Sequence, residues 1–354
     1  GYYKYAMILR GRNPEDAVAT LEDLRKQVPD YPVDALAARI YYHTKNPNLN
    51  RAAEYYGKVA DVTNMDDEDI KDYATIEWML GNKDKSIEVA KAGLTKDAKW
   101  STLNRLVFWN STDKNYTDQA LDYADRLFNK SDSAKITADD YAYYGTALKQ
   151  AKRLDEAVDA YNKSLAALDA DANAIVSKPI LFKSLSDVYN EKGDFDKALE
   201  FVEKSIDAKE NPSFSDYNGL GSQYLEIATK RQQAGDAAGA KAAYKKADDT
   251  YAKIGEKYPD QANYINYVRG SINSAVDPDS KLGLAKPFYE ALVASLEQKA
   301  DRTDNQTAML KTALQYMIVY EFNVKKNKAA AKEWAGKMLG VDPTNEIAKQ
   351  VQAM

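Results

Sequence analysis

Apolar residues recur along this chain at the spacing of amphipathic helices. In the clearest stretch, residues 141, 144, 145 and 148 fall at i, i+3, i+4 and i+7, which places them on one face of a helix. The stripe breaks at 152–154, and a second stripe follows. Its members are Ala157, Val158, Tyr161 and Leu165. The pattern predicts two helices joined by a short turn, with Gly145 and Ala157 at their crossing point, because small side chains let two helix axes approach closely.

Nine units of this kind can be marked by one small residue near the start of each second helix. These residues are Ala17, Ala52, Ser86, Ala120, Ala157, Ala198, Ala240, Ala285 and Ala331. Neighbouring members are 34 to 46 residues apart, which is the period of a helical solenoid, whose helix pairs cannot bury a core alone. We therefore predict one continuous array over residues 1–343 and a short capping helix over residues 344–354.

The unit resembles the tetratricopeptide repeat, which has an aromatic and a small residue on its first helix and a small, an aromatic and a small residue on its second. Here these positions are Tyr141, Gly145, Ala157, Tyr161 and Ser164. The resemblance extends over nearly the whole chain. It implies an all-α fold, namely a right-handed superhelical solenoid of antiparallel helix pairs. It also implies that the first helices line a concave groove for a protein or peptide partner.

One unit is longer than the others. Its two small residues, Gly221 and Ala240, are 19 residues apart, against 12 for Gly145 and Ala157, and its second helix is longer by the same seven residues. Seven residues are about two helical turns, so both stripes keep their phase. The matched change predicts an extended helical hairpin over 215–259 that projects past the rim of the array.

Two other units depart from the pattern. Only Tyr2 to Leu9 are available for the first helix of the first unit, so we expect that helix to be truncated. Pro287 would break a helix in its interior. We therefore expect the second helix of the eighth unit to begin near Pro287, after an irregular connection over 277–286.

Charge and composition exclude several classes of protein. The chain has 354 residues, a formal net charge of -5 and no cysteine. The negative charge opposes a nucleic-acid partner, because phosphate binding needs clustered Lys and Arg. No apolar run approaches the ~18 residues of a transmembrane helix. Residue 1 is Gly rather than Met, which fits a removed export signal, so an exported or periplasmic location with envelope association is favoured over a cytoplasmic one.

The sequence contains few candidates for catalytic or metal-binding residues. His43 is the only histidine, so no two-histidine zinc motif exists, and we assign it to a helix end at the surface. Acidic residues are densest at 66–69, directly before the apolar residues of a helix, where they suit the helix N-terminus. We predict no catalytic residue, no metal site and no cofactor.

The candidate ligand groove is formed by positions between the packing residues of the first helices. These are Tyr41, Tyr42, Lys71, Trp78, Trp109, Thr146, Lys149, Lys183, Asp187, Asn218 and Ser222. Three of them, at 41, 78 and 109, occupy equivalent places in successive units and predict an exposed aromatic strip. Lys183 and Asp187 are an i, i+4 pair that neutralises itself, which disfavours a receptor for acidic peptide tails.

Three functions remain open at this point. The first is a non-enzymatic scaffold that binds an extended peptide or a helix of another protein in its groove. The second is an exported envelope protein that stacks glycan or cell-wall strands on the aromatic strip. The third, an enzyme, is the least favoured, although fold alone does not set function.

Overall fold

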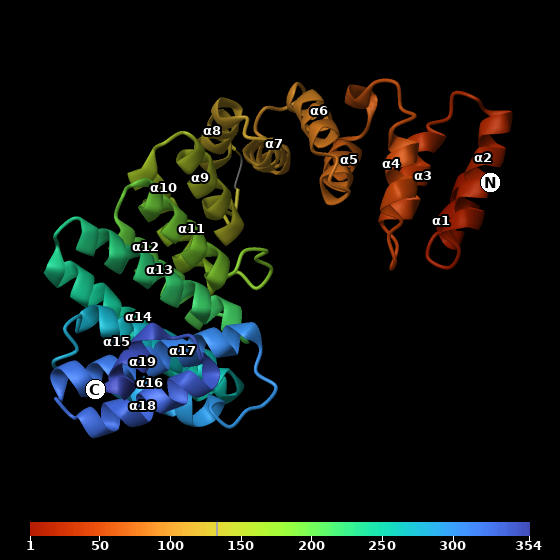
Figure 1. Cartoon of the computed structure of the whole chain (residues 1–354). Coiled ribbons are helices and arrows are strands. Elements are labelled where there is room, and N and C mark those ends of the chain that lie inside the picture. Colours follow the sequence, from red (N-terminus) through yellow and green to blue (C-terminus); the bar gives the residue numbers. More distant parts are fainter. Residues whose placement is uncertain (132–133) are drawn as a thin grey trace. The chain divides into compact units, whose positions relative to one another are not determined.

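The computed structural model describes residues 1–131 and 134–354, and these residues form α-helices and no strand (Figure 1). The chain divides into two compact units, residues 1–198 and 199–354, a division that the sequence analysis did not mark. The helices of the first unit are α1 (Tyr2–Leu9), α2 (Pro14–Gln27), α3 (Val33–Tyr42), α4 (Leu49–Tyr56), α5 (Asp67–Met79), α6 (Lys83–Leu94), α7 (Ser101–Asp113), α8 (Thr117–Asp125), α9 (Ala138–Gln150), α10 (Leu154–Leu168) and α11 (Lys178–Glu191). The boundary lies within α12 (Phe195–Asp207). The second unit continues with α13 (Phe214–Gln233), α14 (Ala237–Lys257), α15 (Ala262–Val276), α16 (Lys286–Leu296), α17 (Asp304–Val319), α18 (Lys328–Val341) and α19 (Glu346–Ala353).

Within each unit, consecutive helices pack against each other as antiparallel pairs (Figure 1), and the predicted all-α fold is confirmed for the described residues. All nine marker residues are buried, and none exposes more than 4% of its surface. Ala17, Ala52 and Ser86 are each at 0%. Small side chains at these places let neighbouring helices approach closely, so that adjacent pairs supply one another's interior.

At the predicted crossing of Gly145 with Ala157, Gly145 also contacts an aromatic residue of the second helix. A Cβ atom on Gly145 would lie 2.8 Å from the ring of Tyr161, so the glycine packs against that ring. Two more pairs repeat the contact, since Cβ atoms at Gly221 and Gly270 would lie 2.6 Å from Tyr251 and 2.5 Å from the ring of Tyr289. The glycine of the first helix therefore leaves space for an aromatic ring of the second helix. A small residue in place of that aromatic residue would leave the space as a void.

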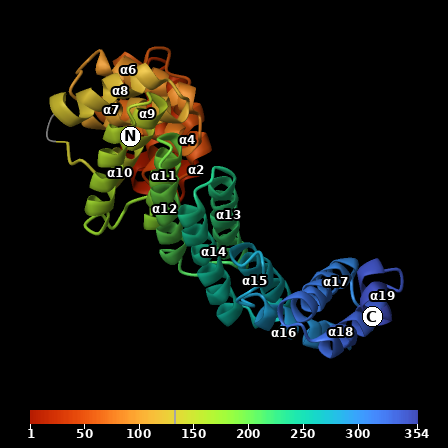
Figure 2. The same ribbon diagram turned by 60° about the vertical axis from the view of Figure 1, so that its left-hand side comes forward.

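The long unit shows the same contact at a longer interval. Gly145 and Tyr161 are 16 residues apart, whereas Gly221 and Tyr251 are 30 apart, because both helices between them are longer. α13 and α14 have 20 and 21 residues, lie side by side in both ribbon views, and occupy the range assigned to an extended hairpin (Figure 2). Its projection past a rim stays a prediction.

Three helices differ from the regular pattern, one at Pro287 and two at the ends of the chain. α16 begins at Lys286 with Pro287 in its first turn, after a connection without regular helix, as expected. α1 has eight residues. α19 buries Ala348 and Val351 against the core of α16 to α18.

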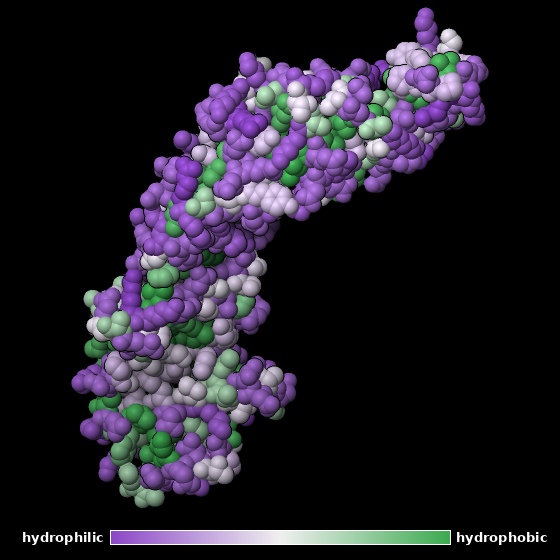
Figure 3. Space-filling view, turned by 90° about the horizontal axis from the view of Figure 1, so that it is seen from above, coloured by the Kyte–Doolittle hydropathy of each residue, from purple (hydrophilic) through white to green (hydrophobic). Residues whose placement is uncertain are grey.

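No helix in the described parts of the chain is long and apolar enough to cross a membrane. On the face that Figure 3 displays, hydrophobic side chains are scattered among a majority of hydrophilic ones.

Several of the turns between the helices of a pair contain one residue with positive φ. Gly81, Gly193 and Gly235 occupy this place in three turns, with φ of 77° to 79°. Lys152 occupies it between α9 and α10 with φ 60°, although left-handed backbone costs a residue with a side chain about 1–2 kcal/mol. These four turns thus share a left-handed residue, and in three of them it is glycine.

We predict that Lys152→Gly is more stable than Lys152→Ala by about 1 kcal/mol, because glycine relieves the left-handed strain. Both changes remove the exposed ion pair of Lys152 with Glu191, so the comparison isolates the backbone. Urea unfolding of the two variants measures the difference. Equal stability would show that the turn carries no strain.

Candidate functional site

The aromatic residues of the predicted strip lie mostly inside the first unit. Tyr41 and Trp109 expose 1% and 7% of their surface, and Trp78 is half-buried. The prediction of an exposed aromatic strip is therefore wrong. The glycan alternative loses the surface on which it depended.

These rings are buried because they connect successive helices. Trp109 on α7 contacts Trp78 on α5, with ring centroids 5.7 Å apart, and stacks on Tyr143 of α9 at 4.8 Å. The indole Nε1 of Trp109 donates to the Asp140 carboxylate at 3.1 Å. Tyr41 likewise donates its hydroxyl to Glu15 at 2.5 Å. Aromatic pairs of this kind stabilise packing between helices.

The other predicted groove residues of the first unit are partly engaged by neighbours. Burial raises the pKa of Tyr42, whose ring lies edge-on to His43. Lys71 pairs with Glu68 at 2.8 Å. The hydroxyl of Thr146 donates a hydrogen bond to the carbonyl oxygen of Ala142. The hydroxyl of Tyr161 lies 3.0 Å from the Thr146 hydroxyl. Lys149 is half-buried on α9.

The remaining candidates lie on α11 and α13. Lys183 and Asp187 do form the expected ion pair, at 3.9 Å. Asn218 and Ser222 lie in the second unit, on α13. The side-chain oxygen of Asn218 accepts hydrogen bonds from Tyr251 at 3.1 Å and Tyr264 at 2.9 Å, whereas Ser222 is exposed.

A different surface of the first unit is hollowed. Two adjoining hollows of about 300 Å³ and 620 Å³ share Arg39 and His43, and together they run across the first helices α1, α3 and α5. We call them the N-terminal groove. The smaller hollow is lined by Tyr3, Met7, Arg10, Leu36, Arg39, Ile40 and His43. The larger one is lined by Arg39, His43, Met65, Asp66, Asp67, Glu68, Asp72 and Lys96. The smaller hollow thus has four apolar lining residues beside Arg10, Arg39 and His43, whereas the larger one is lined mainly by charged residues.

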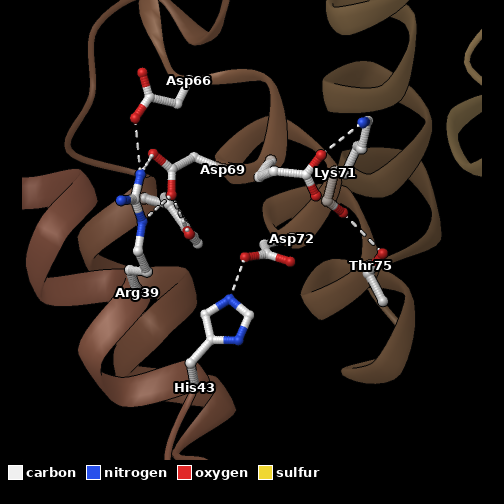
Figure 4. A network of polar contacts seen from close by, with 9 residues as sticks. Arg39, His43, Asp66, Asp69, Lys71, Asp72 and Thr75 are labelled. Carbon is white, nitrogen blue, oxygen red and sulfur yellow. Dashed lines mark hydrogen bonds and ion pairs between the residues drawn. The ribbon is translucent and has the colours of Figure 1, made fainter. Parts of the chain in front are cut away.

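Arg39 fixes the middle of the groove (Figure 4). Its guanidinium lies 2.6 Å from the buried Asp69 carboxylate and 2.9 Å from the exposed Asp66 carboxylate. Its Nε donates to Asp69 at 2.9 Å, which makes the contact a fork, and the buried Tyr56 hydroxyl also donates to Asp69 at 3.0 Å. These bonds join α3 and α4 to the first turn of α5, because Asp69 satisfies donors from both helices.

His43 and Asp72 face each other across the same groove. The histidine Nε2 lies 2.6 Å from a carboxylate oxygen of Asp72 (Figure 4). Burial raises the pKa of the Asp72 carboxyl, and the contact with His43 opposes that rise. The pair closes the groove wall between the end of α3 and the second turn of α5.

The charged end carries an excess of carboxylates. Its lining holds four carboxylates against Arg39 and Lys96, a formal charge of -2 with His43 neutral. Asp66, Asp67 and Glu68 expose 79%, 56% and 78% of their side chains. Within the residues that the structure describes, no group of three or more possible ligands could hold a metal ion. The arrangement instead suits positively charged side chains of a larger ligand.

The acidic residues lie before and in the first turn of α5, as expected, whereas the hollowed face of α3 is not the one that holds the predicted groove residue Tyr41. Leu36, Arg39, Ile40 and His43 lie at i, i+3, i+4 and i+7 and line the groove. Tyr41 is two residues from Arg39, about 200° around the helix, and so points into the core. The mixed stripe of apolar and charged residues on α3 was the signal that could have identified the groove.

Comparisons with known proteins give low overall similarity. No protein-family model matches the sequence, and no curated protein is similar to it. Among solved structures, the C-terminal part of a TPR repeat-containing protein from Cytophaga hutchinsonii is 23% identical with a TM-score of 0.45, over 80% of this chain and 100% of that one. A tetratricopeptide repeat protein from Parabacteroides merdae is 14% identical with a TM-score of 0.43, over 70% of this chain and 91% of that one.

Proposed function

We propose that this chain is a non-enzymatic scaffold whose N-terminal groove binds an extended, positively charged segment of a partner protein. The observation that carries the proposal is the groove itself, which joins a hollow with four apolar residues beside Arg10 to a hollow with a formal charge of -2. A ligand that matches it has an apolar residue at the α1 end and Lys or Arg at the α5 end. Charge complementarity of this kind selects partners and steers their approach.

The exposed carboxylates are available to such a ligand at low cost. Asp67 pairs with Lys96 at 2.8 Å and Glu68 pairs with Lys71 at 2.8 Å, both at the surface. Exposed ion pairs contribute only about 0–1 kcal/mol, so a basic ligand can replace them with little loss. Asp69 does not take part, because it is buried and already bonded by Arg39 and Tyr56.

The groove walls are held in place before the ligand arrives. The fork from Arg39 to Asp69 and the contact of His43 with Asp72 both join α3 to α5. A surface that is already ordered loses little conformational entropy on binding. At the other end, Met7 and Tyr3 of the short helix α1 provide adaptable apolar contacts.

We predict that the double variant Asp67→Asn/Glu68→Gln binds a basic peptide about tenfold more weakly than the unchanged chain. Two exposed charge contacts of up to about 1 kcal/mol each are lost, and tenfold corresponds to about 1.4 kcal/mol. Fluorescence anisotropy of a labelled 12-residue peptide with one Leu followed by Arg and Lys measures the change at low salt.

The matched control is Glu88→Gln/Asp122→Asn, which removes two exposed carboxylates from the second helices α6 and α8 and gives the same net charge. A second control peptide carries Glu in place of Arg and Lys. The proposal fails if the control variant weakens binding equally, or if both peptides bind alike.

A further inference from the structure

The second unit has a surface that its own repeats leave without a neighbour. α14 has 21 residues, whereas α15, the next helix, has 15. The two run antiparallel, since Gly255 lies near Ile265 while Asp248 bonds to Arg269 and Asn273. The first turns of α14 therefore extend beyond the end of α15 at Val276.

A groove of about 400 Å³ lies at this step between the two helices, and we call it the hairpin groove. Its lining is Ala238, Lys241, Ala242, Tyr244, Lys245, Asp248, Ile272, Asn273 and Val276. Ala238 and Ala242 are one turn apart and exposed, while Ile272 and Val276 form the facing wall. Small residues one turn apart allow another helix axis to come within about 8–10 Å.

The edge of the hairpin groove is positively charged. Lys241 and Lys245 are one turn apart on α14, and within the described residues Lys241 has no ion-pair partner. Lys245 pairs with Asp249, and both side chains are exposed, at 74% and 57%. The one carboxylate of the lining, Asp248, accepts both bonds of the Arg269 fork at 2.9 Å and 3.0 Å. The first turn of α14 adds the positive end of its helix dipole.

We propose that the hairpin groove binds an amphipathic helix of a partner protein, with aliphatic residues on one face and acidic residues along its flank. The aliphatic residues would lie between Ala242 and Val276, and the acidic residues would face Lys241 and Lys245. A helix fits better than an extended strand, because the walls are helices whose backbone groups are already bonded internally. The site is independent of the N-terminal groove, which prefers the opposite charge.

The test uses the full chain and two labelled 18-residue helical peptides. Both carry Leu at i, i+4, i+7 and i+11, and their flanking positions are Glu in one peptide and Lys in the other. We expect the Glu peptide to bind at least tenfold more tightly, measured by fluorescence anisotropy. Equal binding of the two peptides, or no binding of either, overturns the proposal.

Two variants locate the contact. Lys241→Glu/Lys245→Glu should weaken binding of the Glu peptide at least tenfold, and Lys230→Glu/Lys253→Glu, the charge-matched control elsewhere on the same hairpin, should change it less than twofold. Ala242→Gln adds bulk in the groove without charge and should also weaken binding. If the control weakens binding as much, general charge attraction explains the result and the proposal is wrong.

A second copy of the chain is the competing occupant. Sedimentation of the full chain decides this, because self-association that Ala242→Gln abolishes would replace the proposed partner helix. Binding of the basic peptide should be the same in Lys241→Glu/Lys245→Glu as in the unchanged chain. Failure at one groove is therefore distinguishable from failure at the other.

Discussion

Replacing Arg105 with leucine is expected to lower the free energy of unfolding of the first unit by about 3–5 kcal/mol. Arg105 on α7 forms a fork with the carboxylate of Asp140 in the first turn of α9, with both contacts at 2.8 Å. The Asp140 side chain is completely buried, whereas that of Arg105 is 22% exposed. Removing the arginine leaves a buried negative charge without its partner, which costs this much in comparable cases.

The Asp140 carboxylate cannot rotate toward solvent when Arg105 is removed, because two further hydrogen bonds hold it in place. It accepts the indole N–H of Trp109 at 3.1 Å and the backbone N–H of Thr137 at 2.9 Å. The second bond belongs to the capping box that begins α9, in which Thr137 also accepts from the Asp140 backbone. Loss of Arg105 therefore weakens the contact between α7 and α9. It also leaves the buried Asp140 carboxylate without its positive partner.

Urea unfolding followed by tryptophan fluorescence measures this effect, because three of the four tryptophans, Trp78, Trp100 and Trp109, lie in the first unit. The control is Arg153→Leu, which removes an arginine whose partner Glu156 is exposed. That change should cost less than about 1 kcal/mol. Similar losses in both variants would mean that burial of Asp140 does not matter to stability.

The second large effect is expected at Gly221, where alanine should lower the free energy of unfolding of the second unit by about 1–3 kcal/mol. A Cβ there would lie 2.6 Å from the ring of Tyr251, which is itself buried and bonded to Asn218. The ring also contacts Tyr264, and only 1% of the surface of Tyr251 is exposed. Adding a methyl group to such a contact forces the two helices apart.

Gly219 is a matched control on the same helix. A Cβ at this position meets no atom within 4 Å, so Gly219→Ala should raise stability by up to about 1 kcal/mol through helix propensity alone. Circular dichroism during urea unfolding compares the two variants. Stabilisation by alanine at both positions would contradict the close Gly–Tyr contact.

Much of the fold could be predicted from the sequence because it depends on local rules. The spacing of apolar residues places the helices, Pro287 fixes the start of α16, and buried small residues mark every pair. The candidate site could not be predicted in the same way. Arg39 and Asp69 are 30 residues apart and meet only because α3 and α5 pack with a particular rotation about their axes.

The sequence by itself determined the helices, their pairing and the matched lengthening of α13 and α14, since each follows from the order of residues along one or two helices. Only the tertiary structure decided that the Tyr161 ring packs on Gly145, that Tyr41 and Trp109 are interior, and which face of α3 is hollowed. A rotation of about 100°, the angle of one residue, exchanges a groove position for a core position. That rotation is fixed by contacts between helices distant in sequence, which periodicity does not encode.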